Sequence, residues 1–205
     1  MVFLKWYIKL KLLFLVLGQL GKCVYEHLSN QKKYDLIIYS HLSVDICNYH
    51  SVESVIQDYD VIINCAAFTN VDKAEEDVET CYAVNYEAVK NMAKLCVKYK
   101  RNFIHISSDF VYGGETKYLA KYLPIFEHDL CSPVNVYGTS KLNAESAILD
   151  ETLQKYLILR VSWLFGIHGN NFIKAIAEQI LDNKVKKLTV VSDQMRSTNR
   201  CKFNC

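Results

Sequence analysis

The chain has 205 residues, of which 51% are hydrophobic and 22% charged, a composition typical of a globular protein with a substantial core. The length is enough for one domain and part of a second. The formal net charge is only +2, and the lysines are spread along the chain instead of forming a basic block. This charge pattern argues against a nucleic-acid partner.

Apolar runs of strand length alternate with segments of helical periodicity along the chain. We expect strands at residues 12–17, 35–39, 60–64, 102–107, 156–161 and 188–191. We expect helices at residues 19–30, 51–58, 77–100, 136–149 and 170–182. Short apolar strands separated by helices predict a Rossmann-like doubly wound α/β fold with a parallel sheet. Ligands of such folds bind beyond the carboxyl ends of the strands.

The first apolar run, residues 12–17, follows three lysines and in that respect resembles a weak signal peptide. No small-residue cleavage site follows it, and the run is too short to span a bilayer. A buried first strand is therefore the favoured interpretation, and we expect no membrane association.

Eight cysteines occur, without a C-x-x-C pair and without a His/Cys cluster at zinc spacing. We interpret them as thiols of a reducing compartment, and we expect a cytoplasmic protein without a bound metal.

Tyr137 and Lys141 form the most informative pair of the sequence. They lie four residues apart within an expected helix, so both side chains project from one face. An ammonium beside a phenol stabilises the phenolate and lowers the pKa of the phenol. Such a tyrosine can exchange a proton with a carbonyl oxygen near neutral pH. Ser107 and Ser108 end the expected strand at 102–107, and either hydroxyl could lie beside Tyr137.

Further candidates follow the other expected strands. Gly18-Gln19-Leu20-Gly21 opens the first helix and could receive a pyrophosphate on helix amides, although an ordinary tight turn explains two glycines as well. The small residues Ala66 and Ala67 would let a ribose pass close to the backbone, or would simply pack.

Three more positions carry two interpretations each. Asn85 lies within a long expected helix and either bonds backbone near the site or is solvated. Trp163 follows the strand at 156–161 and either walls a ligand or packs in the core. Asn171 either caps the last helix or reaches a ligand.

Several segments, in this order, resemble the dTDP-4-dehydrorhamnose reductase family of extended short-chain dehydrogenases/reductases: residues 60–75, 83–85, 106–109, 132–141, 159–163 and 168–172. The resemblance runs from about residue 12 to residue 194. It implies NAD(P)H-dependent reduction of the 4-keto group of dTDP-4-dehydro-L-rhamnose to dTDP-L-rhamnose.

The resemblance also implies roles for individual residues. Tyr137 would donate the proton, Lys141 would lower its pKa and hold the nicotinamide ribose, and Ser108 would bond the reacting carbonyl. The implied cofactor-binding residues are Gly18, Gln19, Leu20, Gly21, Ala66, Ala67, Asn85, Ser107 and Lys141. The implied nucleotide-sugar contacts are Thr69, Val71, Trp163 and Asn171. A monomer and a homodimer both fit the sequence.

The sequence departs from the family pattern at four places, one of which is a longer segment at residues 113–127. Val16-Leu17 runs directly into Gly18, so the first glycine of the family's loop is missing and the loop should be about one turn shorter. Tyr39-Ser40-His41 offers neither an acid for a ribose hydroxyl nor an arginine for a 2′-phosphate, so NADPH and NADH both stay open. After Gln194 the family's continuation is absent.

We therefore expect a Rossmann-like domain at residues 1–165, followed at 166–205 by the start of a truncated substrate-binding region. Two alternatives stay open beside the active reductase. One is an inactive truncated relative, and the other is a non-catalytic relative such as the regulatory β subunit of methionine adenosyltransferase.

Overall fold

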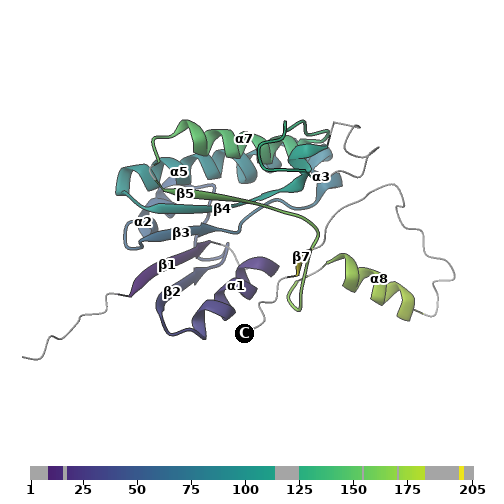
Figure 1. Cartoon of the computed structure of the whole chain (residues 1–205), viewed down its shortest axis with the longest axis horizontal. Coiled ribbons are helices and arrows are strands. Elements are labelled where there is room, and N and C mark those ends of the chain that lie inside the picture. Colours follow the sequence, from purple (N-terminus) through teal and green to yellow (C-terminus); the bar gives the residue numbers. More distant parts are fainter. Residues whose placement is uncertain are drawn as a thin grey trace, which may run out of the picture.

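Five parallel strands form the central sheet of the computed structural model, which describes residues 9–15, 18–113, 125–153, 155–169, 171–182 and 199–200. The strands are β1 (Leu10–Leu15), β2 (Tyr34–Tyr39), β3 (Val61–Asn64), β4 (Asn102–Ser108) and β5 (Tyr156–Val161). Their order is β2-β1-β3-β4-β5, so the direction of winding reverses between β1 and β3 (Figure 1). The Rossmann-like parallel sheet expected from the sequence is confirmed.

Both faces of the sheet are covered, as its continuous apolar strands require. Leu13 and Leu15 of β1 pack into the larger core cluster, whereas Leu12 and Phe14 pack into a second cluster on the opposite face. This alternation is the period of two of a β-strand.

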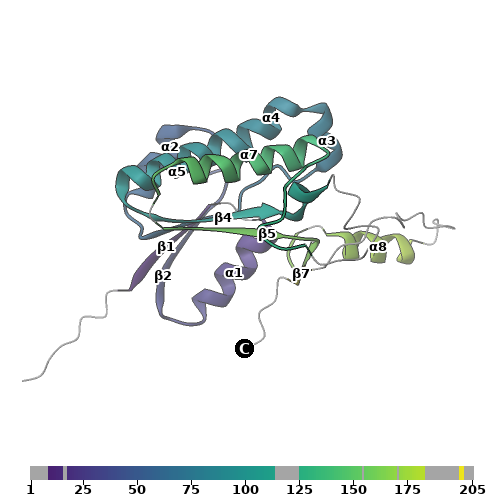
Figure 2. The same ribbon diagram turned by 45° about the horizontal axis from the view of Figure 1, so that its top comes forward.

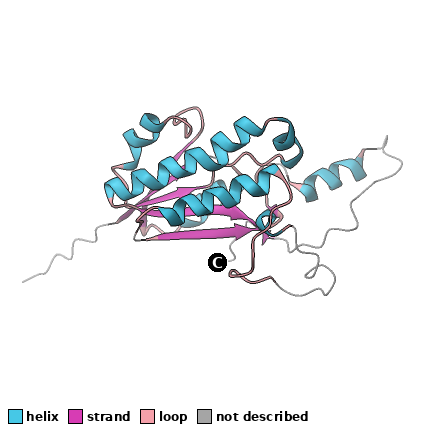
Figure 3. Cartoon of the chain, turned by 90° about the horizontal axis from the view of Figure 1, so that it is seen from above, coloured by secondary structure: helices cyan, strands magenta, loops and turns pink. Residues whose placement is uncertain are grey.

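Helix α1 (Gln19–Ser29) lies on one face of the sheet, and α2 (Tyr49–Ile56), α5 (Ala88–Tyr99) and α7 (Val136–Asp150) lie on the other (Figure 2). Seen from above, these last helices run over the strands (Figure 3). The doubly wound arrangement therefore places the first βα turn at the point where the winding reverses.

The long helix expected at 77–100 is confirmed, but it is not uniform. It consists of α4 (Val78–Tyr82), a π-helical turn (Ala83–Glu87) and α5. A short helix before it, α3 (Val71–Glu76), is not anticipated by the sequence pattern. π-Helical turns of this kind occur frequently at functional sites, and Asn85 lies in this one.

Helix α7 begins at a well-defined cap. The Asn135 side chain accepts a hydrogen bond from the Gly138 backbone N–H at 2.7 Å. A Cβ at Gly138 would lie 2.5 Å from the Phe110 carbonyl oxygen. Only glycine allows this close approach, which brings α7 against the 3₁₀ turn Asp109–Tyr112 that follows β4.

The C-terminal segment lies beside the sheet region. Helix α8 (Phe172–Leu181) stands away from the helices that cover the sheet, and none of its residues is buried (Figure 1). Two short strands, β6 (Leu164–Phe165) and β7 (Asn199–Arg200), pair in parallel as a separate sheet. The strand expected at 188–191 lies outside the described residues, and the domain boundary expected at residue 165 stays a prediction.

In the described ranges, no helix combines the length and the apolar character needed to cross a membrane.

Candidate active site

A cleft of about 600 Å³ opens at the carboxyl ends of the strands, where the winding of the sheet reverses. Most of the candidate residues line it together: Gly18, Gln19, Leu20, Ala67, Thr69, Val71, Ser107, Ser108, Tyr137, Lys141 and Trp163. Its volume is in the range of small-molecule and cofactor sites. Segments far apart in the sequence therefore converge on one site, as the parallel fold predicts.

Gly18 forms the floor of the cleft at the start of α1. It is the N-cap of that helix and, as a glycine, places no side chain over the helix N-terminus. A Cβ added there would have no neighbour closer than the Cys65 carbonyl oxygen at 4.0 Å, so the space above it is open. An open helix N-terminus is a site where a phosphate can be received. Gly21 is buried within α1, and the shortened loop inferred at Val16-Leu17 lies outside the described residues.

The two serines at the end of β4 have different partners. The Ser107 hydroxyl donates to Glu145 Oε1 at 2.5 Å, and that carboxylate also binds Arg160 Nη2 at 2.6 Å. The Ser108 hydroxyl accepts from the Phe110 backbone N–H at 3.3 Å and interacts with Tyr137, where it lowers the pKa of the phenol. Ser108 is therefore the hydroxyl that lies beside the tyrosine.

Tyr137 lies between Ser108 and Phe110. The rings of Phe110 and Tyr137 meet edge to face with centroids 5.5 Å apart. Burial raises the pKa of Tyr137, and this outweighs the lowering by the Ser108 hydroxyl; the charge of Asp109 raises it further. The sequence predicts a lowered pKa, so this structure differs from the expectation.

The reason for the difference lies in where the Lys141 amine points. Lys141 is buried, and its Nζ donates to the Ile106 carbonyl oxygen at 2.7 Å and lies 3.2 Å from His105 Nε2. Burial lowers the pKa of Lys141 to about 8. The amine is thus directed toward strand β4 and is not the group that sets the pKa of Tyr137 here.

Asn85 supports the cleft from behind. Its side chain accepts from the Phe68 backbone N–H at 2.9 Å and donates to the Phe68 carbonyl oxygen at 3.1 Å. A further hydrogen bond from Asn85 Nδ2 reaches Ser140 Oγ on α7 at 3.1 Å. The residue is fully buried, so it bonds backbone near the site and is not solvated.

Two other candidates do not line the cleft. Ala66 is buried, and its backbone N–H donates to Asn64 Oδ1. Asn171 caps α8 by accepting from the Lys174 backbone N–H at 3.1 Å, and its Nδ2 donates to Gln19 Oε1 at 2.9 Å. Capping and a contact to the cleft's edge are thus both present at Asn171.

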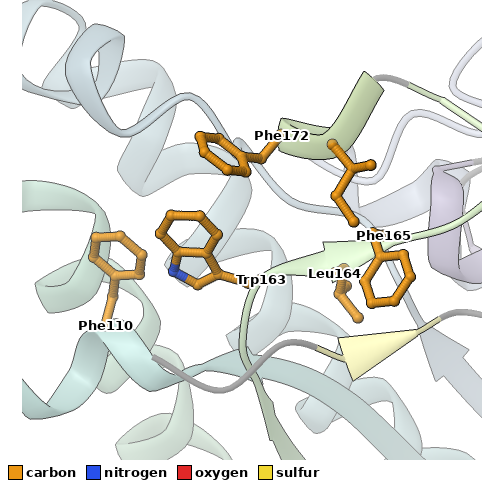
Figure 4. A pocket seen from close by; sticks show the side chains of 6 residues that line it. Phe110, Trp163, Leu164, Phe165 and Phe172 are labelled. Carbon is orange, nitrogen blue, oxygen red and sulfur yellow. The ribbon is translucent and has the colours of Figure 1, made fainter. Parts of the chain in front are cut away.

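An aromatic pocket of about 290 Å³ adjoins the cleft (Figure 4). Trp163 projects between Phe110 and Phe172, and its ring meets the Phe172 ring at 4.9 Å and 71°. Trp163 has a φ of +42°, a strained conformation for a bulky residue that holds the indole at the mouth of the cleft. The pocket and the cleft share Phe110, Trp163 and Leu164.

Some lining residues carry no signal that sequence reasoning could separate from core packing: Cys65, Ile106, Phe110, Val161, Leu164 and Gly169. Asp109 also lines the cleft, and its position directly after Ser108 is a usable signal. The sequence gives no such signal for His105, which is not a lining residue. A histidine within an apolar strand is usually a core residue whose hydrogen bonds are made within the protein.

The described residues contain no group of three or more His, Cys, Asp or Glu side chains suited to a metal ion. Six cysteines fall within the described ranges, and all six are present as thiols: Cys23, Cys47, Cys65, Cys81, Cys96 and Cys131.

Comparison with known proteins gives a consistent family. The sequence profile described as the RmlD substrate binding domain matches residues 12–200. The dTDP-4-dehydrorhamnose reductase of Aggregatibacter actinomycetemcomitans is 36% identical over 181 residues, which are 87% of this chain and 58% of that protein. The Escherichia coli K12 protein of the same name is 36% identical over 166 residues, covering 78% of this chain and 53% of its own length.

Solved structures agree. The dTDP-4-dehydrorhamnose reductase of Bacillus anthracis, crystallised in complex with NADP, superimposes with a TM-score of 0.84 at 32% identity, covering 95% of this chain and 67% of that one. An orthologue from Clostridium acetobutylicum superimposes with a TM-score of 0.82 at 34% identity, covering 94% of this chain and 66% of that one. The chain spans between half and three fifths of the length of the two curated relatives above. It belongs to the dTDP-4-dehydrorhamnose reductase family.

Proposed function

We propose that the chain binds NADPH or NADH in the cleft and reduces the 4-keto group of dTDP-4-dehydro-L-rhamnose to give dTDP-L-rhamnose. The observation that carries this proposal is the convergence of Gly18, Ser108, Tyr137 and Lys141 on one cleft. An open helix N-terminus for a pyrophosphate and a phenol for proton delivery are the parts that such a reduction requires.

The residues present fit a dinucleotide. The open space above Gly18 admits a phosphate, and Ala67, which also lines the cleft, has a small side chain. When bound, the cofactor supplies the hydride, and the protein supplies orientation and the proton. The B. anthracis relative was crystallised with NADP. The turn after β2, Tyr39-Ser40-His41, does not decide between the two cofactors, because it carries neither an acid nor an arginine.

The chain's own residues divide the remaining work. Tyr137 passes its phenolic proton to the substrate oxygen as the carbonyl carbon is reduced, and the phenolate is reprotonated from solvent. The Ser108 hydroxyl lies beside this phenol, where it can donate a hydrogen bond to the reacting oxygen. The shared aromatic pocket around Trp163 offers an apolar wall for the deoxysugar or the thymine ring.

Titration of the purified chain with NADPH and with NADH, followed by nicotinamide fluorescence, tests the proposal first. We expect micromolar binding of at least one of the two, and oxidation of the bound cofactor only after dTDP-4-dehydrorhamnose is added. Binding without turnover would favour a non-catalytic relative. A folded chain that binds neither dinucleotide would contradict the proposal.

The assembly and location of the protein remain predictions. Sedimentation of the chain at several concentrations would distinguish a monomer from a homodimer, and fractionation of source cells would test the cytoplasmic location.

A further inference from the structure

Three buried polar side chains lie in a row directly beneath the cleft. Asn64 ends β3, His105 is its partner on β4, and Lys141 projects from α7 onto them. Asn64 Nδ2 lies 3.2 Å from His105 Nδ1, and His105 Nε2 lies 3.2 Å from Lys141 Nζ. Each of the three is at most 1% exposed, so their hydrogen bonds must be satisfied among protein groups.

The orientation of the Asn64 amide is fixed by the backbone. Its Oδ1 accepts from the Ala66 backbone N–H at 3.0 Å. A backbone N–H can only donate, so the oxygen must face it and the amide nitrogen must face His105. Asn64 therefore presents a donor to the imidazole.

This donor selects the tautomer of His105. Burial holds the pKa of His105 well below its usual value of 6.5, so the imidazole is neutral. Its Nδ1 must accept from Asn64, and its single proton consequently lies on Nε2. His105 then directs an N–H at the Lys141 nitrogen.

The form of Lys141 that fits this arrangement is the uncharged amine. An ammonium has three donors and no acceptor, so it would meet the His105 N–H donor to donor. A neutral amine accepts that hydrogen bond through its lone pair and still donates to the Ile106 carbonyl oxygen. The lowering of the pKa of Lys141 to about 8 by burial acts in the same direction.

Other titratable groups act on Lys141 from the surrounding elements: Glu145 on its own helix, His105 on β4, Cys65 after β3 and Cys81 on α4. Asp109, from the 3₁₀ turn, acts on the neighbouring Tyr137. Glu145 is the carboxylate among them, and Arg160 and Ser107 bind its oxygens. These partners offset the negative charge of Glu145, so its tendency to raise the pKa of Lys141 is reduced.

We propose that Asn64 and His105 are positioning residues that favour the uncharged amine of Lys141 in the cofactor-free chain, and that at mildly alkaline pH the lysine takes up a proton when the dinucleotide binds. The inference rests on the proposed function, since it requires a bound cofactor whose hydroxyls and phosphates favour an ammonium. The proton comes from solvent, and no other bond changes.

A single substitution at Asn64 should reverse the tautomer of His105 and thereby favour the charged form of Lys141. In Asn64→Asp, both carboxylate oxygens accept, one from the Ala66 N–H and one from a proton on His105 Nδ1. His105 Nε2 then becomes an acceptor and stabilises the Lys141 ammonium before any cofactor arrives. The variant should therefore bind the cofactor without the proton uptake of the natural chain.

Calorimetric titration with NADPH at pH 8.5, repeated in buffers of different ionisation enthalpy, measures the number of protons taken up. At this pH the cofactor's phosphates are fully ionised and do not contribute. We expect about 0.5–1 proton per NADPH for the natural chain, falling toward zero at pH 7, because a group of pKa near 8 is already mostly charged there. For Asn64→Asp we expect less than about 0.2 proton at pH 8.5.

Two controls separate the explanations. Cys65→Ala should retain the uptake, which would exclude the thiol that faces the cleft as its source. Circular dichroism confirms that each variant is folded, and the natural chain alone is decisive if Asn64→Asp does not fold. Binding of NADPH to the natural chain without proton uptake at pH 8.5 would overturn this inference and leave the proposed function intact. Absence of binding to a folded chain would instead contradict the proposed function.

Discussion

The sheet region and the C-terminal segment bury their apolar residues to very different extents. Helix α5 contributes six buried residues to the core, whereas α8 contributes none and exposes apolar side chains such as Ile180 and Leu181. The sheet region is therefore held by its own core. The segment that carries α8 is joined to it by polar contacts, among them Asn171 to Gln19 and His168 to Glu26.

The difference bears on the candidate site, because the two regions contribute different parts of it. The packed region supplies Gly18, Ser108, Tyr137 and Lys141, to which the proposed function assigns cofactor binding and proton transfer. The residues from Trp163 onward supply aromatic walls with substantial exposure, such as Phe172 at 51%. Under the proposed function, the chemistry depends on the well-packed part of the chain, and contact with the sugar nucleotide depends on the less buried part.

We expect the largest effect when the Tyr137 hydroxyl is removed, because this change tests proton transfer and leaves the packing of the sheet region intact. Tyr137→Phe should lower kcat by about 100- to 10,000-fold, because only the proton donor is removed. NADPH affinity should stay within about twofold of the natural chain. Steady-state kinetics and fluorescence titration measure the two quantities. Tyr86→Phe, at a half-buried tyrosine of the π-helical turn, is the matched control; a Tyr137→Phe variant as active as this control would refute the assignment.

The comparison of burial is tested by one substitution made in each region. Ile62→Ala in β3 removes a fully buried side chain and should lower the free energy of unfolding by about 2–5 kcal/mol. Ile180→Ala in α8 removes a side chain that is 65% exposed and should change it by less than about 0.5 kcal/mol. Urea unfolding measures both. Equal losses would mean that α8 belongs to the same core.

We expect the buried Lys141 in the cleft to lower the free energy of unfolding of the packed region. The pKa of Lys141 is lowered from 10.5 to about 8 by burial, so below pH 8 the folded chain must carry a buried charge that the unfolded chain keeps in water. Lys141→Met should therefore raise the free energy of unfolding by about 1–3 kcal/mol at pH 7. The gain should shrink between pH 8 and 10.5, where the unfolded chain binds more protons than the folded one.

Unfolding in urea at pH 7 and at pH 10 measures this gain, with the exposed Lys94→Met as the control. A gain that is independent of pH would show that removal of a charge is not its cause.

The smallest expected effect compares two helix caps of the same chemistry. Asn48 caps α2 and Asn171 caps α8, each accepting from a backbone N–H at 3.1 Å. Asn48→Ala should lower the free energy of global unfolding by about 1 kcal/mol. Asn171→Ala should leave it nearly unchanged but accelerate proteolytic cleavage near α8, because that helix opens locally. Equal effects on global unfolding would show that the two regions unfold as one unit.

Much of the architecture can be predicted because it depends on local patterns. The apolar runs at β1, β3 and β4 and the spacing of Tyr137 and Lys141 are properties of neighbouring residues, and they place the strands and helix α7 within a few residues. The order of the strands then brings their carboxyl ends together, so the cleft follows from the fold class.

The remaining features depend on contacts between distant residues. The pairing of Glu145 with Ser107 and Arg160, and the direction of the Lys141 amine toward His105, are set by how α7 packs on β4 and β5. Periodicity carries no information about such contacts. For the same reason the sequence predicts a lowered pKa for Tyr137, whereas burial raises it.

Amide hydrogen exchange of the chain with and without saturating NADPH tests most directly whether the cleft at the reversal of the sheet is the cofactor site. The account predicts slower exchange at the start of α1 near Gly18, in the turn after β3 around Ala67, and at Ser107–Phe110. Exchange in the exposed part of α8 around Ile180 should be unchanged. Bound NADPH that protects other segments and leaves these three unaffected would contradict the account.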